Sequence, residues 1–168
     1  MYSNKDLFQN KAVLKAGFSV YSNMESNSIN SSISNINNKR TDVILNWYIE
    51  IPSINLKAEI AEGTNKEVMD KYVGHFEETK KTNGNIGLAA HNRGYEKNYF
   101  SDIKKLKEGD KIFYKCYDFS KEYEVISNFI IRDTDWTNLL NTEDNRITLI
   151  TCVENEPDYR RCIQGIGL

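Results

Sequence analysis

The chain has 168 residues, a formal net charge of −2 and a pI near 5.8. This length suits one domain with a sizeable core, and the charge gives no support to nucleic-acid binding, which usually shows a basic face. The sequence contains no run of about 18 apolar residues that would span a membrane, and its first residues lack the apolar stretch of a signal peptide. Its two histidines and three cysteines match no zinc-ligand spacing, so we expect no metal site.

The first 41 residues differ in composition from the rest of the chain. Apolar residues at loosely helical spacing predict a helix within residues 1–22. Residues 22–41 are dominated by Ser and Asn, which is typical of a solvated linker. We therefore divide the chain into an N-terminal helix and flexible tail, residues 1–41, and a folded domain, residues 42–168, whose chemistry does not need the tail.

Short strands joined by turns follow within the folded domain. Apolar and β-branched stretches predict strands at residues 47–52, 56–60, 86–92, 111–117, 122–132, 146–152 and 159–165. Between them we expect short helical segments at residues 66–72, 99–106 and 135–140, the first of them capped by Thr64 or Asn65. The pattern favours a mainly β fold: a closed or nearly closed β-barrel with a few short helices.

Cys152 ends the strand around which the chain is organised. The polar residues 153–158 follow it as a predicted loop, and Pro157 cannot donate to a strand ladder, so this strand should stop near the thiol. Most free cysteines are buried packing residues. A thiol at a strand end beside a loop is instead placed to meet a substrate, whereas Cys116 and Cys162, which lie within strands, fit packing better.

Groups that could assist a cysteine nucleophile lie at two other strand ends. His91 ends a predicted strand, where an imidazole suits the general acid for a leaving amine. His75 follows a predicted helix and is interpreted as a packed or surface residue. Arg160 and Arg161 open the last strand and face opposite sides of it. Both arginines can be solvated surface charges, whereas one directed at the thiol would favour the thiolate and hold an oxyanion.

The motifs around these residues resemble those of the sortases, the cell-wall transpeptidases of Gram-positive bacteria. TLITC at residues 148–152 resembles their TLxTC signature, and LAAHN at residues 88–92 resembles the box around their histidine. Arg160, eight residues after Cys152 and five before Gly165, matches the family arginine. The order His, Cys, Arg differs from that of papain-like proteases, in which the Cys comes first. Further matches are IEIP, VGHF and LKEGD, and the resemblance covers residues 46–166.

The resemblance implies an eight-stranded sortase-like β-barrel on the extracytoplasmic face of the membrane. We expect the tail to follow a membrane anchor that this sequence does not contain. The implied catalytic residues are His91, Cys152 and Arg160, and the implied substrate contacts are Thr151 and Asn92, with no metal and no cofactor. The short segment between Cys152 and Arg160 is more similar to sortase classes B and D than to class A, and class D is favoured.

The implied reaction cleaves an LPxTG-like sorting signal through a thioacyl intermediate and transfers the product to an amine. The implied partners are the sorting-signal peptide of a surface protein and an amine acceptor from peptidoglycan or a pilin. Two alternatives stay open: a cysteine hydrolase that uses the same residues, and a non-catalytic β-barrel binding module with Cys152 as a core thiol. Arg161 stays the rival of Arg160, because a bulge in the last strand would exchange the two faces.

Overall fold

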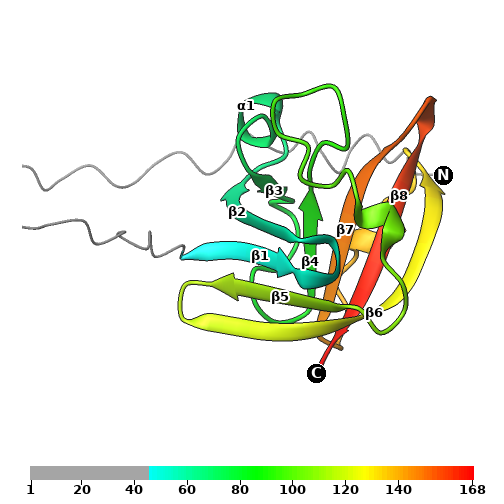
Figure 1. Cartoon of the computed structure of the whole chain (residues 1–168). Helices are drawn as coiled ribbons and strands as arrows, with labels where there is room; N and C mark the ends of the chain where they lie inside the picture. The colour runs from blue at the N-terminus through cyan, green and yellow to red at the C-terminus, as the bar shows by residue number, and fades with distance from the viewer. Residues whose placement is uncertain (1–45) are drawn as a thin grey trace, which may run out of the picture. The chain divides into compact units, whose positions relative to one another are not determined.

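The computed structural model describes residues 46–168, which form a closed, mainly β barrel (Figure 1). Its strands are β1 Trp47–Ile51, β2 Leu56–Glu62, β3 Val73–His75, β4 Asn85–Ala89, β5 Lys111–Cys116, β6 Phe119–Arg132, β7 Arg146–Val153 and β8 Glu156–Gly167. Its short helical segments are η1 Pro52–Ile54, α1 Lys66–Met69, η2 Ile103–Lys105 and η3 Thr137–Leu139. Around the barrel the order is β1-β2-β3-β4-β7-β8-β6-β5, which confirms the predicted eight-stranded barrel.

The predicted N-terminal helix and linker lie outside the described residues. Within residues 46–168, no helix has the length and the apolar character needed to cross a membrane.

The barrel interior is filled by apolar side chains that alternate along the strands. Buried and exposed residues alternate along β2, the period of a strand with one solvated face. On the other side of the barrel, Ile147, Leu149 and Ile163 are each fully buried in the main core. Cys162 belongs to a second, smaller cluster with Ile150. Strands β7 and β8 are therefore covered on both faces near their middle, which explains the continuous apolar run that ends at the thiol.

Strand β4 is buried along its whole length and pairs in parallel with β7. One of its faces contributes to the barrel core. Above the other face lie Leu139 of η3 and the side chains of Phe76 and Thr79, which approach the backbone of Gly87 closely. The absence of a side chain at Gly87 lets η3 pack directly onto the strand.

Gly87→Ala is expected to destabilise the barrel, because a Cβ atom there would lie 2.7 Å from Leu139 Cδ2 and 2.9 Å from Thr79 Cγ2. Overpacking of this kind costs about 1–3 kcal/mol of unfolding free energy. Urea denaturation followed by circular dichroism measures the loss. Leu139→Ala removes the nearest atom, so the double variant should lose less than the sum of the two single variants. Strictly additive losses would contradict the contact.

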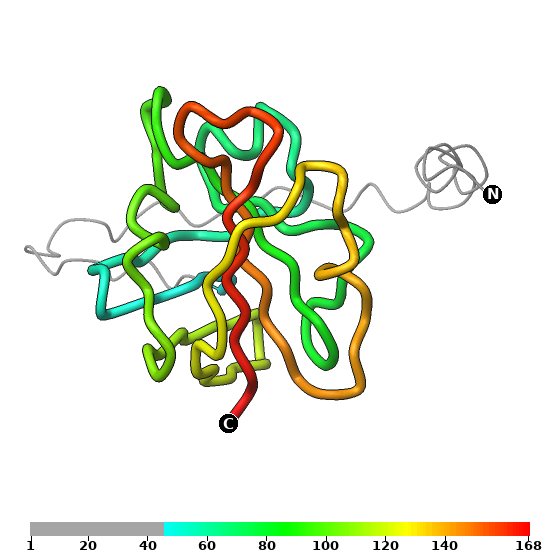
Figure 2. Tube along the Cα trace, turned by 90° about the vertical axis from the view of Figure 1, so that its right-hand side faces the viewer, coloured from blue at the N-terminus to red at the C-terminus, as the bar shows by residue number. Residues whose placement is uncertain are grey.

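Strand β8 runs between β6 and β7, as Figure 2 shows with β8 in red, β6 in yellow and β7 in orange. The predicted loop at residues 153–158 is too long: the turn is Glu154 and Asn155, and β8 already begins at Glu156. Asn155 takes a positive φ of 63°, which asparagine tolerates in tight turns. Pro157 fits inside β8 because the register with β7 shifts here, between Cys152 and Val153.

Other boundaries also differ from the prediction. Strand β3 has only three residues, too few for a recognisable alternation, and the sequence pattern does not predict it. Helix α1 ends at Met69, and of its two candidate caps Asn65 is the one used: its side chain accepts a hydrogen bond from the Val68 N–H at 3.1 Å. The predicted 86–92 strand ends at Ala89, so His91 lies two residues beyond it. Within the predicted 99–106 segment, only η2 is helical.

Candidate active site

Cys152 is the first exposed residue of β7 after five buried ones. Beyond it the regular pairing with β8 breaks, between Cys152 and Val153. The thiol is free, and the carbonyl oxygen of Cys152 accepts a hydrogen bond from Asn92 Nδ2 at 2.7 Å. The candidate nucleophile thus lies at the end of a buried strand, where it is open to solvent.

His91 lies at the same end of the barrel as Cys152. The parallel pairing of β4 with β7 places Ala89 beside Ile150, and His91 and Cys152 are each two residues further along. Two hydrogen bonds hold the chain after β4 against β7: Thr151 Oγ1 donates to the Ala90 carbonyl at 2.7 Å, and Asn92 Nδ2 donates to the Cys152 carbonyl. Strand register therefore places the backbones of the two candidate residues at neighbouring positions at one end of the barrel.

The imidazole of His91 is largely enclosed, with 11% of its side chain exposed. The Tyr95 ring stacks on it, with centroids 3.5 Å apart and planes 6° from parallel. Nε2 of His91 lies 3.6 Å from Oδ1 of Asp70. Burial lowers the pKa of the His91 imidazole below its ordinary value, the Asp70 carboxylate opposes this effect and Lys66 adds to it.

Arg160 lies directly across the β7–β8 ladder from Cys152. Opposite residues of an antiparallel pair project from the same face, so the guanidinium and the thiol share one side of the sheet. Arg160 Nη1 donates to the carbonyls of Pro157 at 2.6 Å and Tyr159 at 2.8 Å, while Nη2 lies 3.8 Å from Asp133 Oδ2. Because a guanidinium has five N–H donors, these bonds leave donors free for a substrate oxygen.

Arg161 pairs with Thr151 and projects from the opposite face of β8, where its Nη1 donates to Asn128 Oδ1 at 2.6 Å. Even so, Arg161 and not Arg160 lines the cavity of about 120 Å³ that opens at the thiol. The lining residues of this cavity are Asn92, Phe100, Ser101, Lys104, Thr151, Cys152, Val153, Glu154 and Arg161. We favour Arg160 for chemistry, because strand register places it on the thiol's face whereas Arg161 projects from the other face of β8.

His75, the other histidine, is fully buried and serves packing. Its Nδ1 lies 2.8 Å from Glu62 Oε1, and its Nε2 lies 3.1 Å from both the Lys80 carbonyl oxygen and Thr79 Oγ1. These partners belong to β2 and to the segment after β3, so the imidazole ties these parts of the barrel together. His91 is thus the histidine available to Cys152.

We expect iodoacetamide at neutral pH to alkylate Cys152 alone in the folded protein. Cys116 is 5% exposed and Cys162 is fully buried, and burial raises the pKa of the Cys162 thiol to about 12. Neither residue therefore offers an accessible thiolate. Peptide mapping by mass spectrometry identifies the labelled residue, with urea-unfolded protein, in which all three cysteines react, as the control. Labelling of Cys116 or Cys162 as fast as Cys152 would contradict this account.

Sequence reasoning misses two neighbours of the candidate histidine. Asp70 follows α1, 21 residues before His91, and no sequence pattern connects the two. Tyr95 lies four residues after His91, and the sequence marks it only as an aromatic residue next to a glycine. In the structure this glycine, Gly94, has a φ of +78° and turns the chain back. Among residues 46–168, no group of three or more His, Cys, Asp or Glu side chains is arranged to hold a metal ion.

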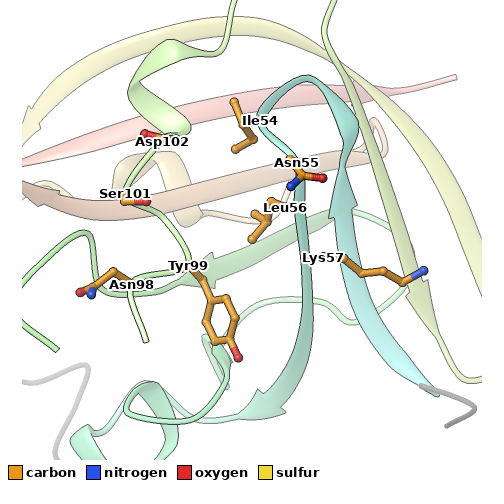
Figure 3. A pocket seen from close by; sticks show the side chains of 8 residues that line it. All are labelled: Ile54, Asn55, Leu56, Lys57, Asn98, Tyr99, Ser101 and Asp102. Atoms are coloured by element: carbon orange, nitrogen blue, oxygen red, sulfur yellow. The ribbon is translucent and has the colours of Figure 1, made fainter. Parts of the chain in front are cut away.

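A larger cavity of about 310 Å³ contains none of the candidate catalytic residues. It lies between the start of β2 and the segment before η2 (Figure 3), and its lining residues are Ile54, Asn55, Leu56, Lys57, Asn98, Tyr99, Ser101 and Asp102. The Lys57 ammonium points away from the other side chains in Figure 3. The hydroxyl of Tyr99 is engaged with the Lys71 carbonyl at 3.1 Å. The cavity at the thiol, although smaller, is therefore the one connected to the candidate chemistry.

Comparisons with known proteins agree with the fold and the motifs. The family model described as Sortase domain matches residues 49–165. Sortase A of Bacillus anthracis is 33% identical over 118 residues, which are 68% of this chain and 55% of that protein. Sortase D of Bacillus subtilis is 31% identical over 108 residues, which are 62% of this chain and 52% of that protein. The chain spans about half the length of these curated relatives.

Solved structures show the same barrel. The pilus-related sortase C of Group B Streptococcus superposes with a TM-score of 0.69 at 28% identity, covering 76% of this chain and 69% of that one. Sortase C1 of Streptococcus suis gives a TM-score of 0.69 at 29% identity, covering 73% of this chain and 72% of that one. The chain belongs to the sortase family. The matches carry the names of sortases A, C and D, so class D stays a prediction.

Proposed function

We propose that this chain is a cysteine transpeptidase that cleaves an LPxTG-like sorting signal and joins the released carboxyl group to an amine. One observation carries the proposal: the exposed, free thiol of Cys152 is paired with Arg160 on the neighbouring strand and lies at the same end of the barrel as His91. Membership of the sortase family supports the same reaction.

In the first half-reaction the Cys152 thiolate attacks the scissile carbonyl carbon of the sorting signal. A carbon–sulfur bond forms, and Arg160 donates hydrogen bonds to the developing oxyanion. The carbon–nitrogen bond then breaks, and the protonated His91 gives its proton to the leaving amine. The product is a thioacyl enzyme, so one difficult substitution is divided into two easier ones.

In the second half-reaction an amine attacks the carbonyl carbon of the thioester. His91, now neutral, accepts the proton of the attacking amine, and the carbon–sulfur bond breaks to return the Cys152 thiolate. The chemistry balances with no oxidant, metal or other cofactor. The acceptor class is an amino group of peptidoglycan or of a pilin, and the similarity to a sortase C described as pilus-related is in keeping with the pilin option.

We further propose that Asn92 and Thr151 contribute to the substrate site. Both residues line the cavity at the thiol. Their side chains donate to the carbonyls of Cys152 and Ala90, so the walls that a bound peptide would meet are held in place. Residues 42–168 would form the catalytic domain, residues 1–41 would be dispensable for chemistry, and the enzyme would act on the outer face of the cell membrane.

Product analysis separates transpeptidation from the hydrolase alternative. A fluorescent LPxTG-type peptide is incubated with the protein, with and without an added amine such as triglycine, and the products are identified by mass spectrometry. We expect the amine-ligated peptide to dominate at millimolar amine and cleavage to be slow without it. Hydrolysis at the same rate in both reactions would favour the hydrolase, and an intact peptide in both would favour the binding module.

A further inference from the structure

A cluster of side chains around His91 includes one carboxylate with no part in the proposed reaction. Asp70, directly after α1, faces Nε2 of His91 through Oδ1 at 3.6 Å, and its other oxygen, Oδ2, lies 2.5 Å from the Lys66 ammonium. The Tyr95 ring covers one face of the imidazole. The Lys66 ammonium lies 5.8 Å from the centre of the Tyr95 ring. Figure 1 shows why these groups meet: α1 lies beside the segment that follows β4.

The contact between Asp70 and His91 is specific to one atom on each side. His91 Nε2 and Asp70 Oδ1 are both buried, and neither has a hydrogen-bond partner among the described residues. Their 3.6 Å separation is only about 0.6 Å longer than an ordinary N–H···O hydrogen bond. An ionised carboxylate oxygen can only accept a hydrogen bond, so the Asp70 carboxylate favours the form of the imidazole that carries its hydrogen on Nε2.

We propose that Asp70 is a positioning residue for His91, an inference that rests on the proposed transpeptidase function. By holding the hydrogen on Nε2, the carboxylate selects one tautomer and leaves Nδ1 as the nitrogen that takes and gives the catalytic proton. The stacked Tyr95 ring keeps the imidazole from turning away from this orientation. Lys66 holds the carboxylate in place through the ion pair and moderates its negative charge.

The charged and titratable groups around the imidazole predict opposite effects for two substitutions. Asp70 and Lys66 face it from the α1 side, Tyr95 from its own segment, and Cys152 lies at the corresponding position on β7. Asp70 favours the imidazolium ion and Lys66 disfavours it. Removing the carboxylate should therefore lower the pKa of His91, and removing the ammonium should raise it.

Nuclear magnetic resonance of the intact chain tests this directly, because the sequence has only two histidines. The Cε1–Hε1 signal of each imidazole is followed against pH in the wild type, Asp70→Asn and Lys66→Met, with His91→Gln to assign the signals. We expect the His91 midpoint to fall by about 0.5–1 pH unit in Asp70→Asn and to rise in Lys66→Met. Long-range nitrogen-15 spectra of the neutral wild-type ring should show the hydrogen on Nε2.

Asp144→Asn is the matched control, because Asp144 also pairs with a cation, Arg146 at 2.6 Å, but lies by the opposite end of β7. This control should leave the His91 titration unchanged. An unchanged or raised midpoint in a folded Asp70→Asn variant, or a neutral ring with its hydrogen on Nδ1, would overturn the proposal. If Asp70→Asn does not fold by circular dichroism, Asp70→Glu and Lys66→Met decide in its place: Asp70→Glu should keep the tautomer and Lys66→Met should raise the midpoint, and failure of either overturns the inference.

Activity gives the second readout and separates this inference from the proposed function. In Asp70→Asn the alkaline limb of the pH profile of kcat/KM should move to lower pH with the His91 midpoint, because the general acid loses its proton earlier. A protein that titrates as expected but cleaves no peptide would overturn the transpeptidase and leave the Asp70–His91 contact standing. A protein that cleaves peptide with an unmoved limb and an unmoved midpoint would overturn only the role of Asp70.

Discussion

Cys152→Ala should lower the rate of sorting-peptide cleavage by at least about four orders of magnitude, because removal of a catalytic nucleophile leaves only binding and orientation. The fold should survive, since the side chain is exposed and its loss opens no cavity. Steady-state kinetics with a fluorogenic LPxTG-type peptide measures the rate, and circular dichroism checks the fold.

Cys116→Ala and Cys162→Ala are the matched controls. Both thiols are buried, so these substitutions should lose about 1 kcal/mol or somewhat more of unfolding free energy and keep the chemistry. Cleavage that continues in Cys152→Ala, or disappears in a folded Cys116→Ala variant, would mean that the nucleophile has been assigned to the wrong residue.

Arg160→Ala should reduce kcat/KM by about two to three orders of magnitude, the scale of losing an oxyanion donor. The physical reason is the register of β7 with β8, which places Arg160 across from Cys152. Arg160→Lys should recover little of the loss, because an ammonium lacks the planar fork of donors. Kinetics on one peptide, with all variants at equal concentration, gives the comparison.

Arg161→Ala is the control that decides between the two arginines. Arg161 projects from the other face of β8 and donates a hydrogen bond to Asn128. It also lines the cavity at the thiol. Its loss should cost far less activity than the loss of Arg160. A near-normal rate for Arg160→Ala together with an inactive Arg161→Ala would reverse the assignment.

Much of the barrel can be predicted from the sequence, because apolar and β-branched runs mark most of its strands. The same reasoning predicts the face of Arg160: Ile163 is the best core candidate on the last strand, and the structure buries it completely. Against β7 the extra residues of β8 are 157–159, and against β6 the extra residue belongs to β6, between Val125 and Ser127. Residues 160–165 of β8 therefore alternate regularly, and the two arginine faces are not exchanged.

The features that cannot be predicted depend on contacts between distant segments. Strand β3 is too short to leave a pattern, and it is defined by pairing with β2 and β4. The extent of β8 depends on a two-residue turn and on a register shift that lets a strand include Pro157. The approach of Asp70 to His91 depends on where α1 packs, which neither residue's neighbours in the sequence encode.

The most direct test of the account is the intact mass of the protein during turnover of a sorting-signal peptide without an added amine. We expect a species heavier by the acyl fragment of the peptide, with the modification mapped to Cys152 and sensitive to hydroxylamine, as a thioester is. The adduct should be absent in Cys152→Ala and should disappear when an amine acceptor is added. Peptide cleavage that proceeds with no adduct on Cys152, or an adduct on another residue, would contradict the account.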